Sequence, residues 1–156
     1  MLRFPYLDEP LLGSPPPSLP NPALVRWRPL VPVVIHGPAA MLSFGRALVD
    51  SGANDTLFPL DAATLLNIPL LASTGHAMRW RGQRFQLTYG TVDLELQDDD
   101  GKTLCWQAVV AFTSAGLRYP LLGMCGCLEV LDARLVGVDR MIELEPNASF
   151  PQSTRP

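Results

Sequence analysis

One segment of the sequence combines residue types that could do acid–base chemistry. Asp50 follows the apolar run Ala47–Val49 and is itself followed by Ser51, Gly52 and Ala53. A buried strand that ends in Asp holds the carboxylate on a rigid support, and a Ser-Gly pair then turns the chain tightly. Backbone N–H groups in such a turn can point at the carboxylate and stabilise its charged form. An Asp that merely opens a turn is the simpler alternative, and the tetrapeptide alone does not decide between the two.

The surrounding residues favour the first interpretation. The segment 47–58 resembles the active-site block of the retropepsin-like aspartic proteases, the family of the retroviral proteases: apolar residues, Asp-Ser-Gly-Ala, a polar pair, a threonine and further apolar residues. The segment 119–130 resembles the second hallmark of that family, in which two apolar residues and a glycine lead into a short helix. Here the apolar pair and the glycine are Leu121–Gly123. The resemblance extends over about residues 33–144, which is most of the chain.

The resemblance implies an aspartic endopeptidase that works as a symmetric homodimer on a peptide or protein substrate, without a cofactor. A single lobe of this family is a closed, mostly-β domain with one catalytic Asp, and this chain has only one Asp-Ser-Gly motif, at Asp50. Two carboxylates about 3 Å apart cannot both ionise, so the two Asp50 side chains would share one proton and activate a water molecule. The residues that would orient Asp50 or line the cleft are Ser51, Gly52, Ala53, Leu122 and Gly123.

Two positions depart from the pattern of the family. The family commonly has Asp where this chain has Asn54, and Arg where Met124 follows the glycine. In retroviral members those two charges pair and brace the active-site loop. Because both charges are missing here, no buried charge is left alone, and the loss can be nearly neutral for stability. The departure motivates a rival hypothesis: a catalytically weak or inactive dimer of the same fold that binds peptides or scaffolds a complex.

The family also has a flap, a hairpin that closes over the substrate. Leu71–Met78 occupies roughly that place, with Gly75 as the expected tip, and Thr74, Gly75 and His76 are the expected substrate contacts. Trp80–Gln83 is the alternative tip, and an ordinary β-turn is the alternative for both segments. A lone turn histidine is usually exposed, so His76 is not interpreted as a catalytic or metal-binding residue.

The elements that must position these residues are mostly strands. Hydrophobic alternation and turn signals predict strands over 30–35, 41–49, 85–96, 104–112, 134–138 and 141–144. One short helix is predicted over Pro59–Leu66, which begins with Pro and has Asp61 in its first turn, and a second over Cys125–Leu131. Short strands between frequent turns predict a mostly-β fold, a small closed barrel or a sandwich-like domain, with one or two short helices.

Composition excludes several classes of protein. The 156 residues, 47% hydrophobic and 17% charged, fit one folded domain or one domain plus a tail. No apolar run reaches the roughly 20 residues of a membrane span, and a net charge of -3 argues against nucleic-acid binding. The start of the chain lacks the pattern of a signal peptide, and three cysteines, an odd number, indicate reduced thiols in the cytoplasm.

Two patterns suggest a metal ion only superficially. The Cys-Gly-Cys run Cys125–Cys127 lacks the third and fourth ligands of a zinc site, because Cys105, His36 and His76 are scattered along the chain. Asp98–Asp100 lacks the glutamate that closes a calcium loop, so we interpret it as a solvated hairpin tip. We therefore expect no metal site.

Prolines divide the chain into parts. Ten of the 16 prolines lie at or before Pro38, which disfavours helices and central strands there. We divide the chain into a proline-rich extended arm over 1–29, a retropepsin-like domain over 30–146 and a C-terminal tail over 147–156. A disordered tail is the alternative for the arm, although its apolar residues argue against that. In a third hypothesis the arm is the functional part, with Pro15–Pro20 docking as polyproline II on an aromatic groove of a partner.

Overall fold

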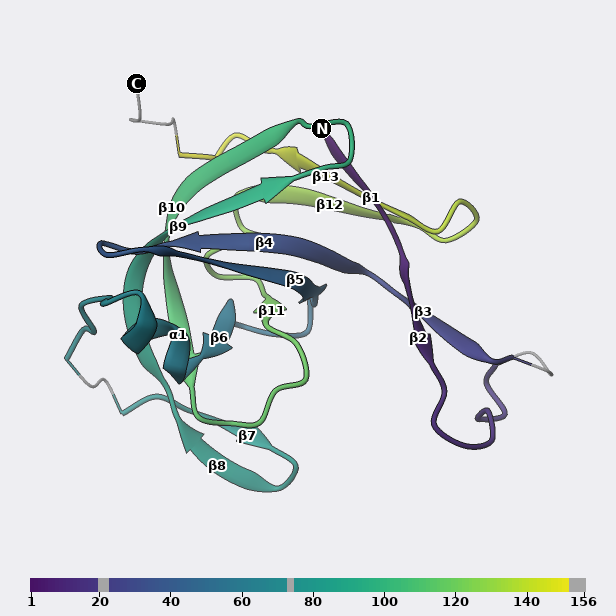
Figure 1. The fold of residues 1–156 in the computed structure, drawn as a ribbon, viewed down its shortest axis with the longest axis horizontal. Coiled ribbons are helices and arrows are strands. Elements are labelled where there is room, and N and C mark those ends of the chain that lie inside the picture. Colours follow the sequence, from purple (N-terminus) through teal and green to yellow (C-terminus); the bar gives the residue numbers. More distant parts are fainter. Residues whose placement is uncertain (20–22, 73–74, 152–156) are drawn as a thin grey trace.

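The computed structural model describes residues 1–19, 23–72 and 75–151, and strands dominate this part of the chain (Figure 1). One short helix, α1 (Leu60–Leu65), accompanies the described strands. Six of these strands close into a barrel. The predicted fold class, a mostly-β protein with a small closed barrel and one or two short helices, is therefore confirmed.

The barrel combines two long hairpins with two short strands. Its strands are β4 (Leu30–His36), β5 (Met41–Val49), β6 (Leu57–Pro59), β9 (Thr88–Gln97), β10 (Thr103–Thr113) and β11 (Leu121–Leu122). Around the barrel they follow the order β10-β6-β11-β5-β4-β9. The hairpins β4–β5 and β9–β10 are antiparallel, whereas β6 runs parallel to β10 and β11 runs parallel to β5. The two short strands therefore join the edges of the hairpins and close the barrel.

The other described strands form three smaller sheets. A three-stranded sheet has the order β1-β13-β12, and two pairs of strands, β2–β3 and β7–β8, stand by themselves. Figure 1 shows β2 and β3 projecting away from the barrel, and β7 and β8 below α1 and β6. The bounds are β1 (Leu2–Pro5), β2 (Leu7–Pro10), β3 (Val25–Arg28), β7 (Ala77–Trp80), β8 (Gln83–Gln86), β12 (Leu131–Val136) and β13 (Met141–Pro146).

The first residues of the chain belong to the folded core. β1 pairs with β13, and its side chains Leu2 and Phe4 are only 1% and 2% exposed. Both lie in the same hydrophobic cluster as barrel residues such as Ile35. The segment interpreted as an arm over 1–29 therefore contributes an edge strand to the core before it projects as β2 and β3. Of the proposed polyproline segment Pro15–Pro20, Pro20 lies outside the described residues.

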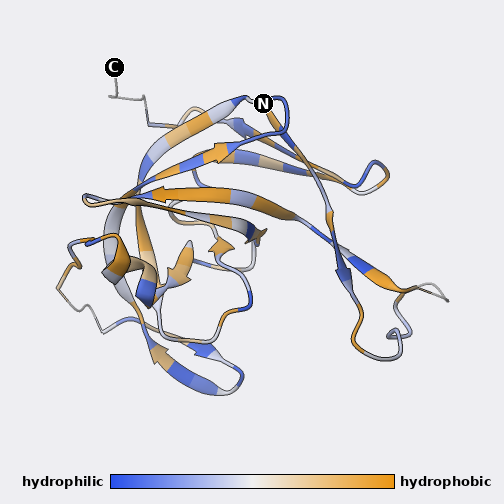
Figure 2. Cartoon of the chain, viewed as in Figure 1, coloured by the Kyte–Doolittle hydropathy of each residue, from blue (hydrophilic) through white to orange (hydrophobic). Residues whose placement is uncertain are grey.

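The alternation in the second half of the predicted strand 85–96 is confirmed. Val92, Leu94 and Leu96 on β9 are buried, and the residues between them are partly or fully exposed. Figure 2 shows the hydrophobic residues gathered on the barrel strands and α1. The rest of the predicted segment also forms strand, as the end of β8 and the start of β9, but the single strand expected over 85–96 is interrupted at Leu87. The Leu87 N–H donates to the carbonyl of His76 (2.9 Å), a bond that follows directly on the last β7–β8 pair, Ala77 and Gln86.

One predicted helix forms and the other does not. The helix predicted over Pro59–Leu66 is present as α1, whose residues Ala62 and Ala63 are buried. The helix predicted over Cys125–Leu131 is wrong, since that segment is a series of turns. Gly126 has φ +85°, which is outside the helical region. The N–H of Leu128 bonds to the carbonyl of Gly123 (3.0 Å), five residues back rather than the four of an α-helix.

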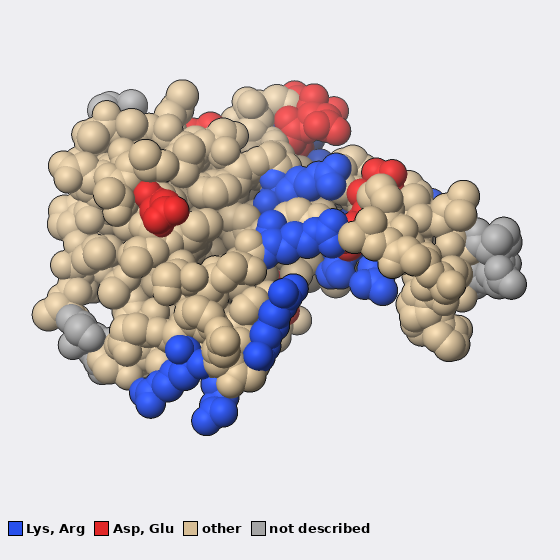
Figure 3. Space-filling model, turned by 60° about the horizontal axis from the view of Figure 1, so that its bottom comes forward, with Lys and Arg blue, Asp and Glu red and all other residues tan. Residues whose placement is uncertain are grey.

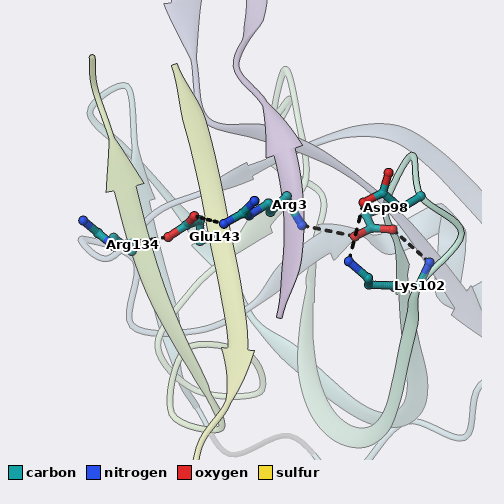
Figure 4. A network of polar contacts seen from close by, with 6 residues as sticks. Arg3, Asp98, Lys102, Arg134 and Glu143 are labelled. Carbon is teal, nitrogen blue, oxygen red and sulfur yellow. Dashed lines mark hydrogen bonds and ion pairs between the residues drawn. The ribbon is translucent and has the colours of Figure 1, made fainter. Parts of the chain in front are cut away.

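The hairpin tip 98–101 is not fully solvated, contrary to our expectation. Asp98 is 5% exposed, and its carboxylate accepts the backbone N–H of Lys102 (2.8 Å) and of Arg3 (3.3 Å), as Figure 4 shows. Burial raises the pKa of Asp98, but these hydrogen bonds and the Lys102 charge outweigh burial and lower the pKa overall. Asp98 therefore joins the β9–β10 turn to β1, while Asp99 and Asp100 remain exposed.

We predict that Asp98→Asn lowers the melting temperature at neutral pH. The charged carboxylate accepts these hydrogen bonds better than a neutral amide does. Because the native pKa is depressed, the contribution is complete above the ordinary carboxyl pKa of about 4 and is lost as the pH falls through the lower native value. The difference between wild type and variant should therefore shrink below about pH 4 in thermal unfolding followed by circular dichroism. Asp99→Asn is the matched control, and an equal effect there would contradict the assignment.

Candidate active site

Asp50 lies at the end of a barrel strand, as the sequence predicted. It follows Val49, the buried last residue of β5, and it is itself half-buried. The Asp50 N–H donates to the carbonyl of Leu122 (3.1 Å), and the Leu48 N–H donates to the carbonyl of Pro120 (2.8 Å). These bonds join the end of β5 to β11, so the two blocks of the sequence motif lie side by side and fix the backbone that carries the carboxylate.

The turn after Asp50 holds its carboxylate. The N–H of Gly52 donates to Oδ1 of Asp50 (2.9 Å), and the N–H of Ala53 donates to the backbone carbonyl of Asp50 (3.1 Å). A Cβ at position 52 would lie only 3.2 Å from that Oδ1, so glycine leaves room for the bond. Ser51 and Gly52 are exposed. The carboxylate is therefore oriented by the backbone on one side while its turn faces solvent.

Gly123 makes the closest approach between the two blocks. A Cβ at this position would lie 2.3 Å from the carbonyl oxygen of Asp55 and 2.8 Å from that of Ala53, so no other residue fits. The Gly123 N–H donates to Oγ1 of Thr56 (3.2 Å), which comes from 67 residues earlier in the chain. Thr56 is fully buried. The threonine and the glycine of the two motifs thus have a direct structural role, in which each positions the other.

Backbone hydrogen bonds brace the loop at Asn54 and Met124, the two positions that depart from the retropepsin pattern. The Met124 N–H donates to the carbonyl of Ala53 (2.9 Å), and the Cys125 N–H donates to the carbonyl of Asn54 (2.8 Å). In return, the Thr56 N–H donates to the carbonyl of Cys125 (3.0 Å). The side chains of Asn54 and Met124 are exposed. The loop is therefore held in place although both residues are neutral, because the hydrogen bonds that hold it come from main-chain groups.

Asp55 is a site residue that the sequence analysis did not single out. Its Oδ2 accepts a hydrogen bond from the hydroxyl of Tyr89 on β9 (3.4 Å). Burial, followed by the charge of Asp55 and this bond, raises the pKa of Tyr89. Asp55 and Tyr89 line a pocket of about 390 Å³ together with Cys125 and Trp106; Asp50 is not among its lining residues. Asp55 belongs to the polar pair of the motif, and this is the one feature of the sequence that could have identified it as a site residue. Nothing in the sequence pointed to Tyr89.

The hairpin tip near the site lies at Arg81 and Gly82, the alternative position of the two we considered. Both residues have positive φ, 50° and 80°, as a two-residue hairpin turn requires. The expected tip at Gly75 is wrong, because Gly75 and His76 precede β7 and are exposed. Thr74 lies outside the described residues.

The base of the β7–β8 hairpin rests beside the candidate site. Met78 on β7 packs against a small hydrophobic cluster of which Leu121 and Ala53 are also members. Ala53 follows the Asp50 turn, and Leu121 belongs to β11. The His76 ring stands edge-on to the Tyr89 ring, with their centroids 6.0 Å apart. The hairpin thus emerges from the same group of residues that surrounds the loop of Asp50.

A buried carboxylate, that of Glu9, holds the segment that leads into β11. Glu9 on β2 is 3% exposed and forms ion pairs with Arg28 on β3 and with Arg118. The hydroxyl of Tyr119 also donates to Glu9 (3.3 Å). Burial raises the pKa of Glu9, but the two guanidinium groups outweigh burial and lower the pKa overall. Glu9 therefore joins the projecting β2–β3 pair to the segment that leads into β11.

Two of the three cysteine thiols have raised pKa values. Cys127 is buried in the hydrophobic core, and burial, with a smaller contribution from the charge of Glu129, raises the pKa of its thiol to about 12. Burial and the charges of Glu129 and Asp55 also raise the pKa of Cys125. Across the described ranges, no three His, Cys, Asp or Glu side chains gather closely enough to hold a metal ion.

The described residues contain no helix that is long and apolar enough to cross a membrane.

No protein-family model and no curated protein matches the sequence. The assignment of a function therefore depends on the two motifs and on the geometry that joins them.

We predict that Gly123→Ala destabilises the protein by about 3 kcal/mol, because an added Cβ collides with main-chain atoms that cannot move aside easily. For a chain of this length the melting temperature should fall by roughly 6–12 °C. Gly45→Ala on β5 is the matched control, since a Cβ there meets nothing within 4 Å. Thermal unfolding of the two variants compares them directly, and an equally small effect of both would contradict the close approach at Gly123.

Proposed function

We propose that this chain is a retropepsin-like aspartic endopeptidase, which hydrolyses peptide bonds with a water molecule activated between the Asp50 carboxylates of a homodimer. The observation that carries the proposal is the position of Asp50. Its carboxylate is held by the Gly52 N–H at the end of a buried strand, in a loop fastened to the block that contains Leu122. A turn that merely changes the chain direction does not need this long-range fastening. We place the enzyme in the cytoplasm, on the evidence of its odd number of cysteines.

The chemistry follows from the electrostatics of two close carboxylates. The pair shares one proton, because two negative charges about 3 Å apart repel strongly. The charged carboxylate takes a proton from water, whose oxygen attacks the carbonyl carbon, and the protonated carboxylate donates a hydrogen bond to the carbonyl oxygen. The tetrahedral intermediate then collapses, the C–N bond breaks and the amine leaves with a proton from the pair. No covalent bond to the enzyme forms.

A dimer is required because each chain supplies one carboxylate. Ser51 and Gly52 are exposed at the tip of the turn, which leaves room for the same turn of a second copy to approach. Met124 is 41% exposed beside the same loop, an apolar side chain that a subunit contact would cover. The rival hypothesis, a dimer that only binds peptides, draws on the neutral Asn54 and Met124. Main-chain bonds brace the loop in their place, which favours the enzyme.

We predict that the purified protein cleaves members of a diverse peptide library and that Asp50→Asn abolishes the cleavage. The loss should be on the order of 10³-fold or more, as expected when a group that acts only in the transition state is removed. Activity should fall on both sides of an optimum, since the pair works only with one proton. Mass spectrometry of products between pH 3.5 and 7.5 tests this prediction. Asp61→Asn, an exposed residue of α1, is the control. Cleavage that survives Asp50→Asn would contradict the assignment of Asp50.

We predict that specific activity depends on protein concentration. Dilution below the dissociation constant of the dimer separates the two carboxylates, so the activity per chain should fall while the fold remains. Analytical ultracentrifugation gives the dissociation constant, and a dilution series of cleavage rates should show its midpoint at the same concentration. A chain that sediments as a monomer and retains full activity per chain would rule out the shared pair.

A further inference from the structure

The β7–β8 hairpin carries positive charge that nothing on the hairpin balances. Its strands and turn, residues 77–86, contain three arginines and no acidic residue. Arg79, Arg81 and Arg84 are all exposed. Within the described ranges, none of the three takes part in an ion pair. The chain as a whole has a net charge of -3, so this concentration of arginine runs against the overall balance.

The arrangement works against the stability of the hairpin itself. Arg79 and Arg84 lie directly opposite each other in the register of β7 and β8, and like charges in that position repel. Arg81 adopts φ +50° at the tip, a conformation that residues other than glycine, asparagine and aspartate rarely take. The hairpin is a two-stranded sheet outside the barrel, and such pairs are only marginally stable alone. An anionic group bound to the hairpin would relieve the repulsion.

The hairpin also holds an unused hydrogen-bond donor. The indole N–H of Trp80, next to the tip, is shielded from water and has no acceptor among the described residues. A buried donor without a partner is unfavourable, and it becomes satisfied when a carbonyl or carboxylate oxygen reaches it. Trp80 is opposite Gln83, which is the residue pair that closes the turn. The ten residues of the hairpin thus hold three exposed cationic side chains and one buried donor without an acceptor among the described residues.

The charged hairpin lies next to the candidate active site. Met78 packs against the hydrophobic cluster that contains Leu121, and Ala53, at the end of the Asp50 turn, packs against the same cluster. Figure 3 shows Lys and Arg side chains spread along one face of the molecule, from the junction with the projecting strands to the lower edge, with few acidic side chains between them. Figure 2 shows β8 as largely hydrophilic.

We propose that Arg79, Arg81 and Arg84 select acidic peptides, so that the substrates of this enzyme carry Asp or Glu near the bond that is cleaved. The part of this inference that says the bound peptide is cleaved rests on the proposed function. Guanidinium groups bind carboxylates through paired, charge-assisted hydrogen bonds, which give both attraction and geometry. A bound acidic segment also cancels the repulsion between Arg79 and Arg84. The hairpin is therefore most stable when an acidic peptide is bound.

The test measures binding in the Asp50→Asn protein, which does not depend on cleavage. Two fluorescein-labelled peptides share one sequence, except that three Glu of the first are Gln in the second. Fluorescence anisotropy at 50 and 300 mM salt gives their dissociation constants. We expect the acidic peptide to bind roughly tenfold more tightly at low salt, as three exposed ion pairs allow, and the difference to shrink at high salt.

Substitutions assign the preference to the hairpin. The triple variant Arg79→Gln, Arg81→Gln, Arg84→Gln should lose the preference for the acidic peptide, and the corresponding triple Lys variant should keep most of it. The matched control is Arg3→Gln, Lys102→Gln, Arg134→Gln, which removes the same net charge from residues of the contacts in Figure 4. The control should keep the preference. Circular dichroism of every variant checks that it is folded.

The outcomes separate the two proposals. Equal affinity for both peptides, no binding of either, or a preference that survives the triple Gln variant would overturn the role of the hairpin, even if Asp50-dependent cleavage is found. A single-stranded oligonucleotide that binds more tightly than the acidic peptide would overturn it as well. In another outcome, the preference for the acidic peptide is lost in the triple Gln variant while the wild-type protein cleaves no peptide. That result would support the hairpin as a recognition element and contradict the proposed endopeptidase activity.

Discussion

The contact between Gly123 and the main chain of residues 53–56 is the constraint on which the rest of the structure depends. Two segments that are far apart in the sequence approach more closely there than any side chain permits. The approach allows the N–H of Gly123 to reach Thr56 and lets β11 enter between β5 and β6. The same contact therefore closes the barrel and sets the backbone at Asp50. A substitution at Gly123 would therefore change the geometry of the candidate site as well as the stability of the fold.

Main-chain groups carry most of this arrangement. The carboxylate of Asp50 accepts the N–H of Gly52, and the loop is fastened by bonds from the N–H groups of Met124 and Cys125. Bonds of this kind depend on the path of the chain rather than on side-chain charge. The neutral pair Asn54 and Met124 is therefore compatible with a braced loop, because the bonds that fasten the loop come from the main chain.

Two buried charged groups join separate pieces of the chain. Glu9 ties the projecting strands β2 and β3 to Arg118, shortly before β11, and Asp98 ties the β9–β10 turn to β1. Both carboxylates are buried and have lowered pKa values because their partners stabilise the charged form. The β7–β8 hairpin differs, since its three arginines all face solvent within ten consecutive residues and form no ion pair among the described residues. That contrast is what makes the hairpin a candidate for contact with another molecule.

The sequence by itself determined the local features. Alternation placed Val92, Leu94 and Leu96 on one buried face, and the apolar run before Asp50 placed that residue at the end of a strand. Only the tertiary structure decided which segments meet. The turn at Arg81, the turns in place of a helix after Gly123, the burial of Asp98 and the entry of Leu2 into the core all depend on partners distant in the chain. Strand pairing and close main-chain contacts of this kind leave little trace in local periodicity, because each residue type is compatible with several partners until the barrel closes.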